Sequence, residues 1–139
     1  MTEQRPPYNT LPRSEHDEQV AFVSEVLYRY ANRPDFIRAL FFSTFNGAWL
    51  GGNAGARARQ MQKAKEAGFL PGVADILYLQ PRGEWMYLVI EMKSKGGKLS
   101  EEQKTFINAV KWEGEGLAVV CHSAEEAIET FDKYMGDGQ

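Results

Sequence analysis

Two apolar runs joined by a short turn constrain the fold of this chain more than any other feature of its sequence. Residues 72–79 and 86–93 are rich in β-branched, aromatic and other apolar side chains, and the segment between them contains Pro81 and Gly83. This pattern predicts two neighbouring strands. Charged side chains interrupt the runs at Asp75, Glu91 and Lys93.

These three charged residues would gather at one place in such a pair of strands. Side chains alternate between the two faces of a strand, so Glu91 and Lys93 share a face and the apolar residue between them takes the other. If the strands are antiparallel and the loop is centred on Gly83, Asp75 lies directly opposite Glu91, with Cβ atoms roughly 4.5–5.5 Å apart. A register shift of one residue would move Asp75 to the other face.

Such a pair of carboxylates indicates a metal site. The two groups repel each other unless a proton or a cation lies between them. Carboxylate oxygens suit Mg²⁺ or Mn²⁺, and Mg²⁺ completes its shell with water and substrate phosphate. Asp75 and Glu91 therefore predict a divalent-metal centre. A strand-end salt bridge between Lys93 and Glu91, with no further role, is the alternative interpretation.

In this order, Asp75 followed by Glu91-Met92-Lys93 resembles the PD-(D/E)xK nuclease superfamily. The surrounding segments are most similar to its VRR-NUC branch, in particular the small stand-alone versions found in phages, and they comprise residues 14–19, 45–47, 68–75, 91–94 and 97–103. The resemblance runs from about residue 14 to residue 135. One departure is Ala74, where the family usually has a proline that shapes the backbone and offers no ligand.

The resemblance implies a Mg²⁺- or Mn²⁺-dependent DNA endonuclease that hydrolyses phosphodiester bonds. It also implies selectivity for branched DNA, such as flaps or Holliday junctions, and a homodimer. A catalytically inactive module that binds nucleic acid or takes part in assembly is the alternative function on the same fold. An RNA nuclease is a third hypothesis, although nothing in the sequence reports contact with a 2′-hydroxyl.

The resemblance also assigns further ligands and roles. It places one glutamate of the first helix in the metal shell, for which we take Glu18, with Glu15 as the alternative, and it adds the main-chain carbonyl of Met92. Lys93 would orient or deprotonate the attacking water, or neutralise the transition state. Both glutamates also fit a solvated helix start, where the helix dipole favours anions.

Two polar residues complete the site that the resemblance implies. Gln103 would contact substrate or support Lys93, although its spacing from Ser100 also fits a helix cap. Asn46 would stand near the active site and contact DNA, although Asn46-Gly47 equally fits a simple turn.

Basic residues mark candidate DNA contacts, although the net charge of the chain is −3. Local charge governs a binding face more than the sum does. We expect phosphate contacts from one face of a helix over residues 56–67 and from the loop over residues 94–99. The residues are Arg57, Arg59 and Lys63 in the helix and Lys95 and Lys98 in the loop. A solvated helix face without function is the alternative.

The remaining pattern predicts one α/β domain with a mixed central sheet flanked by helices on both faces. Residues 1–13 are expected to form a flexible arm, residues 14–135 the domain and residues 136–139 a frayed end. Helices are expected over residues 14–32, 56–67, from 100 and from 123, and further strands over residues 39–45 and 117–121.

Several function classes are excluded by composition and motifs. The single cysteine, Cys121, rules out an intramolecular disulfide framework and favours a reducing cytoplasm. The resemblance implies that this is the cytoplasm of a bacterial or phage-infected cell. No apolar run approaches the ~20 residues that span a bilayer, so no membrane partner is expected. The glycine-rich residues 51–55 lack the Gly-Lys-Ser/Thr of a P-loop, so no nucleotide cofactor is expected. No His/Cys spacing fits zinc.

Overall fold

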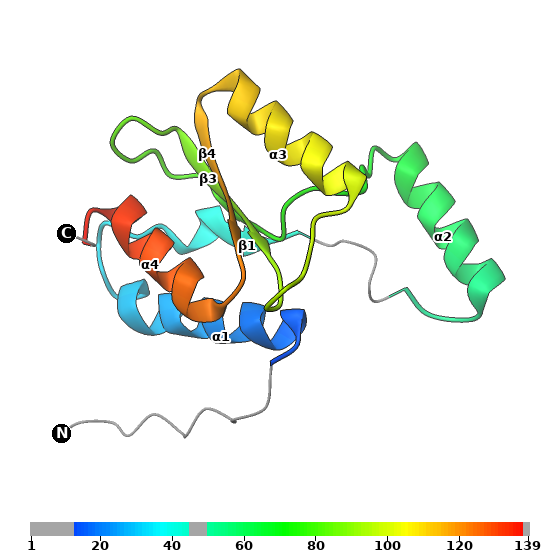
Figure 1. Cartoon of the computed structure of the whole chain (residues 1–139), viewed down its shortest axis with the longest axis horizontal. Helices are drawn as coiled ribbons and strands as arrows, with labels where there is room; N and C mark the ends of the chain where they lie inside the picture. The colour runs from blue at the N-terminus through cyan, green and yellow to red at the C-terminus, as the bar shows by residue number, and fades with distance from the viewer. Residues whose placement is uncertain (1–12, 45–49, 138–139) are drawn as a thin grey trace.

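The computed structural model describes residues 13–44 and 50–137 of the chain. Its elements follow the predicted order of one helix, one strand, a helix, two strands, a helix, a strand and a helix, with a short 3₁₀ turn, η1, before the first strand (Figure 1). They are α1 (Glu15–Tyr30), η1 (Arg38–Leu40), β1 (Phe41–Ser43), α2 (Ala54–Glu66), β2 (Ile76–Tyr78), β3 (Tyr87–Met92), α3 (Glu101–Glu113), β4 (Gly116–Cys121) and α4 (Ala124–Met135).

The four strands form one mixed sheet in the order β1-β2-β3-β4. β2 pairs antiparallel with β1 and β3, whereas β4 lies parallel to β3. A parallel neighbour needs a long crossover, and α3 provides it. In the β2–β3 ladder Ile76 lies opposite Ile90, so the next pair outward is Asp75 and Glu91. The predicted register, centred on Gly83, is therefore confirmed.

Helices cover both faces of the sheet, which confirms the predicted α/β class. α1 and α4 contact each other and pack on one face, whereas α3 packs on the other. The core under α1 and α4 is aromatic: Phe131 lies 5.2–6.3 Å, between ring centroids, from Phe22, Phe36, Phe41 and Tyr78. The smaller core under α3 is aliphatic and combines Val89 and Ala118 with residues of that helix.

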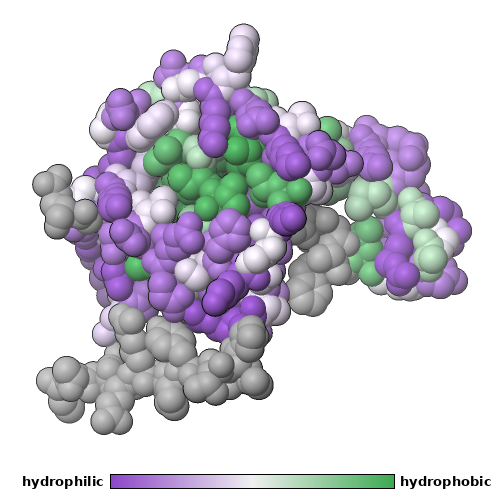
Figure 2. Space-filling model, viewed as in Figure 1, coloured by the Kyte–Doolittle hydropathy of each residue, from purple (hydrophilic) through white to green (hydrophobic). Residues whose placement is uncertain are grey.

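β4 is an edge strand with a partly exposed apolar surface. Among the described residues it pairs only with β3. Leu117, Val119 and Val120 are only partly buried, and Figure 2 shows hydrophobic residues gathered on the face where this strand runs, with hydrophilic residues around them.

α2 stands apart from the rest of the domain (Figure 1), and none of its residues is buried. It begins two residues earlier than predicted because the Asn53 side chain caps it by accepting a hydrogen bond from the Ala56 N–H. Alanine-rich and basic, this helix makes no core of its own.

The strands near the site are shorter than the apolar runs that predicted them. Residues 39–45 were expected to form one strand, but the Leu40 N–H bonds back to the Ile37 carbonyl, so this segment turns before pairing begins. β1 then finds partners only along the three residues of β2. No helix in the described ranges is long and apolar enough to cross a membrane.

Candidate metal centre

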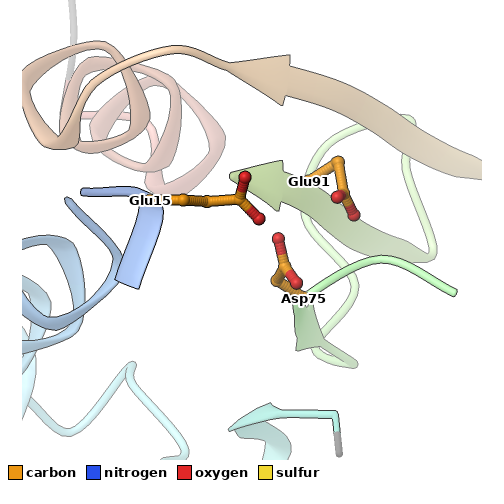
Figure 3. Close-up of side chains that lie close together, drawn as sticks. All are labelled: Glu15, Asp75 and Glu91. Atoms are coloured by element: carbon orange, nitrogen blue, oxygen red, sulfur yellow. The ribbon is translucent and has the colours of Figure 1, made fainter. Parts of the chain in front are cut away.

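Three carboxylates from distant parts of the sequence meet at one end of the sheet. Glu15 opens α1, Asp75 immediately precedes β2, and Glu91 lies near the end of β3; each offers an oxygen within 4.8 Å of the others. Figure 3 shows the three side chains directed toward one another. Asp75 and Glu91 are 4% and 1% exposed, and Glu15 is half-buried.

Asp75 is fixed by the backbone of both neighbouring strands. The Met92 N–H donates to Asp75 Oδ2 over 2.8 Å, and the Thr44 N–H donates to the Asp75 carbonyl over 2.8 Å. Thr44 Oγ1 also donates to the carbonyl of Ala74, over 2.6 Å. Sequence reasoning missed Thr44, whose only signal was its place at the end of an apolar run. Thr44 bonds to main-chain carbonyls, which every residue has, so the sequence could not indicate that Ala74 and Asp75 are its partners.

Glu91 is held by a residue that also caps α3. Gln103 Nε2 donates to Glu91 Oε1 over 2.8 Å, and Gln103 Oε1 accepts the Ser100 N–H over 2.8 Å, so both halves of the amide are used. The predicted capping box of Ser100 and Gln103 is confirmed. Gln103 therefore supports Glu91 directly, and its contact with substrate or with Lys93 stays a prediction.

The second oxygen of Glu91 is buried and has no hydrogen-bond partner among the described residues. Burial above all, and then the charge of Asp75, raise the pKa of Glu91 from 4.5 to about 8, against the opposing effect of Lys93. Burial likewise raises the pKa of Glu15; Lys93 lowers it and Asp75 raises it. In the metal-free chain, burial therefore favours the protonated forms of Glu91 and Glu15.

Lys93 lies among these carboxylates, as predicted. Its Nζ is 3.6 Å from Glu91 Oε1 and 3.8 Å from Glu15 Oε2, and the residue is 7% exposed. One ammonium therefore faces two acids on different elements. The simple strand-end salt bridge with Glu91 does not describe this arrangement fully, because the contact to α1 is of similar length.

The donor set fits a hard divalent cation. All three side chains offer oxygen, and the buried Glu91 oxygen without a partner is an acceptor that a cation or a proton must satisfy. Oxygen-only sets suit Mg²⁺ and Mn²⁺ better than softer metals. The residues present therefore fit the metal that the sequence predicted.

Glu18, our first choice for the helix ligand, lies elsewhere. Its Oε2 accepts a hydrogen bond from the Ala124 N–H at the start of α4, and its Oε1 lies 3.1 Å from Arg13 Nε. Three residues of helix separate Glu18 from Glu15, which turns the two side chains about 60° apart. Glu15, the alternative, faces the carboxylates, whereas Glu18 joins α1 to α4.

The candidate DNA contacts divide into two exposed groups. Lys95 and Lys98 lie in the loop after β3, which His122 holds through a contact of 3.1 Å between its Nε2 and the Gly97 carbonyl. The main-chain carbonyl of Met92 remains a predicted metal ligand, and the N–H of the same residue donates to Asp75. Asn46 lies outside the described residues.

The second group is on α2 and is smaller than expected. Arg59 and Lys63 are four residues apart and share one side of the helix. Arg57 lies about 160° around the helix from Arg59, and its Nη1 donates to the Gly52 carbonyl over 2.6 Å. The predicted basic face therefore contains Arg59 and Lys63, and Arg57 holds the turn before α2.

Comparison with known proteins adds the family. The sequence model of the VRR-NUC domain matches residues 50–125, which is more than half of the chain. A solved structure described as a VRR_NUC domain protein has the same fold: it covers 93% of this chain and 93% of its own, with a TM-score of 0.67 and 21% sequence identity. The curated proteins gave no match. Because the matched segment includes Asp75, Glu91 and Lys93 and covers most of the sheet around them, the chain belongs to the VRR-NUC family of nuclease domains.

Proposed function

We propose that this protein is a divalent-metal-dependent DNA endonuclease of the PD-(D/E)xK type. The observation that carries the proposal is the meeting of Glu15, Asp75 and Glu91, with Lys93 beside them. One buried oxygen of Glu91 has no hydrogen-bond partner among the described residues. Family membership supports a nuclease, and the donor chemistry supports Mg²⁺ or Mn²⁺.

The three carboxylates, with the Met92 carbonyl, are the groups that would hold the metal. A bound divalent cation supplies the means to lower the pKa of a water and to stabilise negative charge on phosphorus. The Met92 N–H keeps Asp75 oriented, and Gln103 keeps Glu91 oriented, so the ligands do not need to rearrange.

Lys93 has the position of a residue that handles the attacking water. Its ammonium lies close to both Glu91 and Glu15, and Lys93 itself is 7% exposed. From there it would donate to the water or to a phosphate oxygen and offset the charge that develops in the transition state.

Two basic elements would contact the DNA backbone near the site. The chain leaves the sheet after Thr44, forms α2 and returns at Asp75, and those two residues are hydrogen-bonded to each other. The excursion that contains Arg59 and Lys63 therefore starts and ends at the metal centre. Lys95 and Lys98 lie two and five residues after Lys93. Phosphate contacts from these elements would position the DNA at the site. The substrate that we propose, branched DNA such as a flap or a Holliday junction, follows from the family resemblance.

Cleavage of labelled DNA tests the proposal. A panel of single strand, duplex, flap, fork and four-way junction would be incubated with Mg²⁺, Mn²⁺ or EDTA at fixed salt. We expect metal-dependent cleavage that is strongest on a branched substrate and falls at least about 100-fold in Asp75→Asn and in Lys93→Ala.

The matched control is Lys133→Ala, which removes an exposed ammonium on α4 that pairs with Glu129. It should cleave like the wild type. Binding of the panel by the wild-type protein without cleavage in any metal would instead establish the alternative, an inactive nucleic-acid-binding module.

We also propose a homodimer that forms through β4. The open edge of β4 and its partly exposed Leu117, Val119 and Val120 offer backbone groups and apolar area to a second copy. Light scattering would measure the mass, and Val120→Lys, which changes a partly exposed residue outside both core clusters, should give a folded monomer. A wild-type protein that is monomeric at all concentrations would contradict the dimer and leave the nuclease proposal unaffected.

A further inference from the structure

α2 is a helix that the described part of the domain does not stabilise by packing. None of its 13 residues is buried, and none belongs to either hydrophobic core (Figure 1). In the described ranges the hydrogen bonds of its side chains, such as that from Gln60 Nε2 to the Gly51 carbonyl, stay within residues 51–66. The stability of α2 in the free protein therefore depends mainly on its own sequence.

That sequence gives a marginal helix. Isolated helices shorter than about 12–15 residues are marginal in water, because a first turn must form before the rest can follow. α2 has 13 residues, and Gly55 in its first turn is a poor helix former. Asn53 caps the start of the helix, and the Phe69 N–H bonds to the Ala64 carbonyl near its end. These caps do not replace a packed face.

The charge of α2 indicates the kind of partner that would stabilise it. Four basic residues and one acid, Glu66, give this helix a net charge of +3 in a chain whose net charge is −3. Arg59 and Lys63 lie at positions i and i+4, where like charges destabilise an isolated helix. A row of phosphates along this side would attract both side chains and offset their repulsion. The partner that fits α2 is a polyanion.

Duplex DNA fits α2 better than a single strand does. Residues 54–66 contain no aromatic side chain on which an unpaired base could stack. At 1.5 Å per residue the helix is roughly 20 Å long, which is about the length of six base pairs. The excursion that contains α2 starts after Thr44 and returns at Asp75, so a bound duplex would be linked to the metal centre through the chain on both sides.

We propose that α2 binds a duplex arm of the substrate DNA and that this contact supplies the stability that the helix lacks in the free protein. The inference rests on the proposed nuclease function, and it adds a conformational step to the phosphate contacts of Arg59 and Lys63. The free energy of ordering the helix is then part of the free energy of binding. Substitutions that change helix propensity should change affinity, even where the side chain makes no contact with DNA.

Helix propensity at Ala58 tests the coupling. Ala58 is exposed and lies about 100° around the helix from Arg59 and about 140° from Lys63. Ala58→Gly should weaken binding of a labelled duplex in EDTA about fivefold, as the propensities of alanine and glycine predict. Ala58→Ser should weaken it about twofold, because serine is intermediate. Fluorescence anisotropy measures both affinities.

Gly55→Ala should have the opposite effect. An added Cβ at this position would lie 3.4 Å from the end of the flexible Arg59 side chain and 3.5 Å from the Asn53 side chain, so an alanine fits. It should tighten duplex binding about two- to fivefold, since alanine loses less conformational freedom in a helix. The methyl group adds neither charge nor a hydrogen-bond donor. Binding weaker than that of the wild type would contradict the coupling.

Ala109→Gly is the matched control, because Ala109 is an exposed alanine of α3, a helix that packs on the sheet. It should lower the Tm, followed by tryptophan fluorescence, by about 4 °C and leave duplex affinity unchanged. Ala58→Gly should leave this Tm unchanged. Wild-type affinity in Ala58→Gly would overturn the proposal, as would a loss of Tm equal to that of the control.

Amide hydrogen exchange measures the ordering directly. Residues 54–66 should show little protection in the free protein and gain protection when the duplex is bound, whereas α3 should be protected in both states. Protection of α2 equal to that of α3 without DNA would overturn the proposal, because the helix would then be stable by itself.

A parallel cleavage assay in Mn²⁺ separates this inference from the nuclease proposal. Protection of α2 by DNA with no cleavage by the wild type would support the ordering of α2 and contradict the nuclease. Cleavage with no change in the exchange of α2 would support the nuclease and overturn the ordering. A folded wild-type protein that neither binds nor cleaves DNA would overturn both.

Discussion

Glu91 lies near the end of β3, among the carboxylates of the candidate metal centre. Gln103 donates a hydrogen bond to one of its oxygens, and the other oxygen has no hydrogen-bond partner among the described residues. A buried carboxylate in this state is unfavourable for stability unless it takes up a proton or a cation. At the residue scale, the acids of the site therefore lower the stability of the metal-free protein and provide its affinity for metal. Substitutions of single acids should separate these two effects.

Glu91→Gln should stabilise the metal-free protein in a way that depends on pH. The folded chain holds a proton on Glu91 up to a pKa of about 8, against an ordinary value of 4.5. Between these values the folded state binds more protons than the unfolded state, so the contribution of Glu91 to stability falls as the pH rises. A glutamine does not titrate, so the advantage of the variant should widen from pH 5 to pH 9.

Thermal unfolding in EDTA measures this advantage. We expect the difference in Tm between Glu91→Gln and the wild type to grow by about 4 °C or more, the shift that corresponds to about 1 kcal/mol in a domain of this size. A difference that stays constant with pH would show that Glu91 does not titrate in this window.

Glu15→Gln should change metal affinity, whereas Glu18→Gln should change the stability of the fold. Glu15 faces the carboxylates, so its substitution should weaken Mn²⁺ binding at least about tenfold and leave metal-free stability nearly unchanged. Glu18 accepts the Ala124 N–H and pairs with Arg13, so its substitution should cost about 1–3 kcal/mol of stability and leave Mn²⁺ affinity unchanged.

The measurement is thermal unfolding with and without Mn²⁺. The rise in Tm that Mn²⁺ produces reports affinity, and the Tm in EDTA reports stability. If Glu18→Gln removed the response to Mn²⁺ while Glu15→Gln retained it, the assignment of Glu15 to the metal would be wrong.

At the scale of the elements, the segment before β2 determines where Asp75 lies. Gly72 has a φ of +91° and sits against the first turn of α3, where an added Cβ would lie 2.5 Å from the main-chain carbon of Glu102. A close approach of this kind needs glycine. The sequence contains this glycine, but only the packing of α3 shows why no other residue fits.

Gly72→Ala should therefore destabilise the protein more than Gly68→Ala. Both positions have positive φ, and Gly68 at +103° has no atom within 4 Å of an added Cβ among those considered. The alanine at position 68 should cost about 1–2 kcal/mol from backbone strain alone. At position 72 the collision with Glu102 should at least double the loss.

Urea denaturation of the two variants gives both free energies of unfolding. The difference between them isolates the steric effect from the strain that the two positions share. Equal losses would show that α3 moves aside without penalty and that Gly72 does not fix the segment before Asp75.

At the scale of the whole molecule, the net charge of −3 weakens the attraction of the protein for DNA, whereas the basic elements near the site strengthen it locally. α2 projects from the domain (Figure 1). Arg59 and Lys63 share one side of this helix, and the loop after β3 adds Lys95 and Lys98. Association with DNA should therefore depend on a few local phosphate contacts, with no general attraction.

Salt dependence of binding counts those contacts. If the four basic side chains each contact a phosphate, the slope of log K against log salt in EDTA should be about −3.6 on duplex arms. Lys63→Ala should reduce its magnitude by about 0.9, and Lys111→Ala, on the exposed side of α3, should leave it unchanged. Anisotropy of labelled DNA measures both; equal slopes for the two variants would contradict a role for α2.

Sequence alone determined the hairpin of β2 and β3 and the charged residues that this hairpin brings together. The period of two along each strand and a turn centred on Gly83 put Asp75 opposite Glu91 and brought Lys93 to the same place, and the structure confirms this register. Ser14, Ser100 and Ser123 each accept a hydrogen bond from the backbone N–H three residues later and so cap α1, α3 and α4. Serine before a helix is a cap signal that the sequence itself contains. All of these features depend on neighbours that are close in the chain or joined by one turn.

Tertiary structure decided which helical glutamate faces the site, which acid Gln103 supports, and that α2 stands apart. Glu15 and Glu18 are equivalent in local pattern, and their roles differ only because packing of α1 against α4 sets the rotation of α1 about its axis. Such a rotation depends on contacts between residues more than 100 positions apart. No local periodicity encodes it, because a helix presents the same pattern whichever side it turns toward its neighbour.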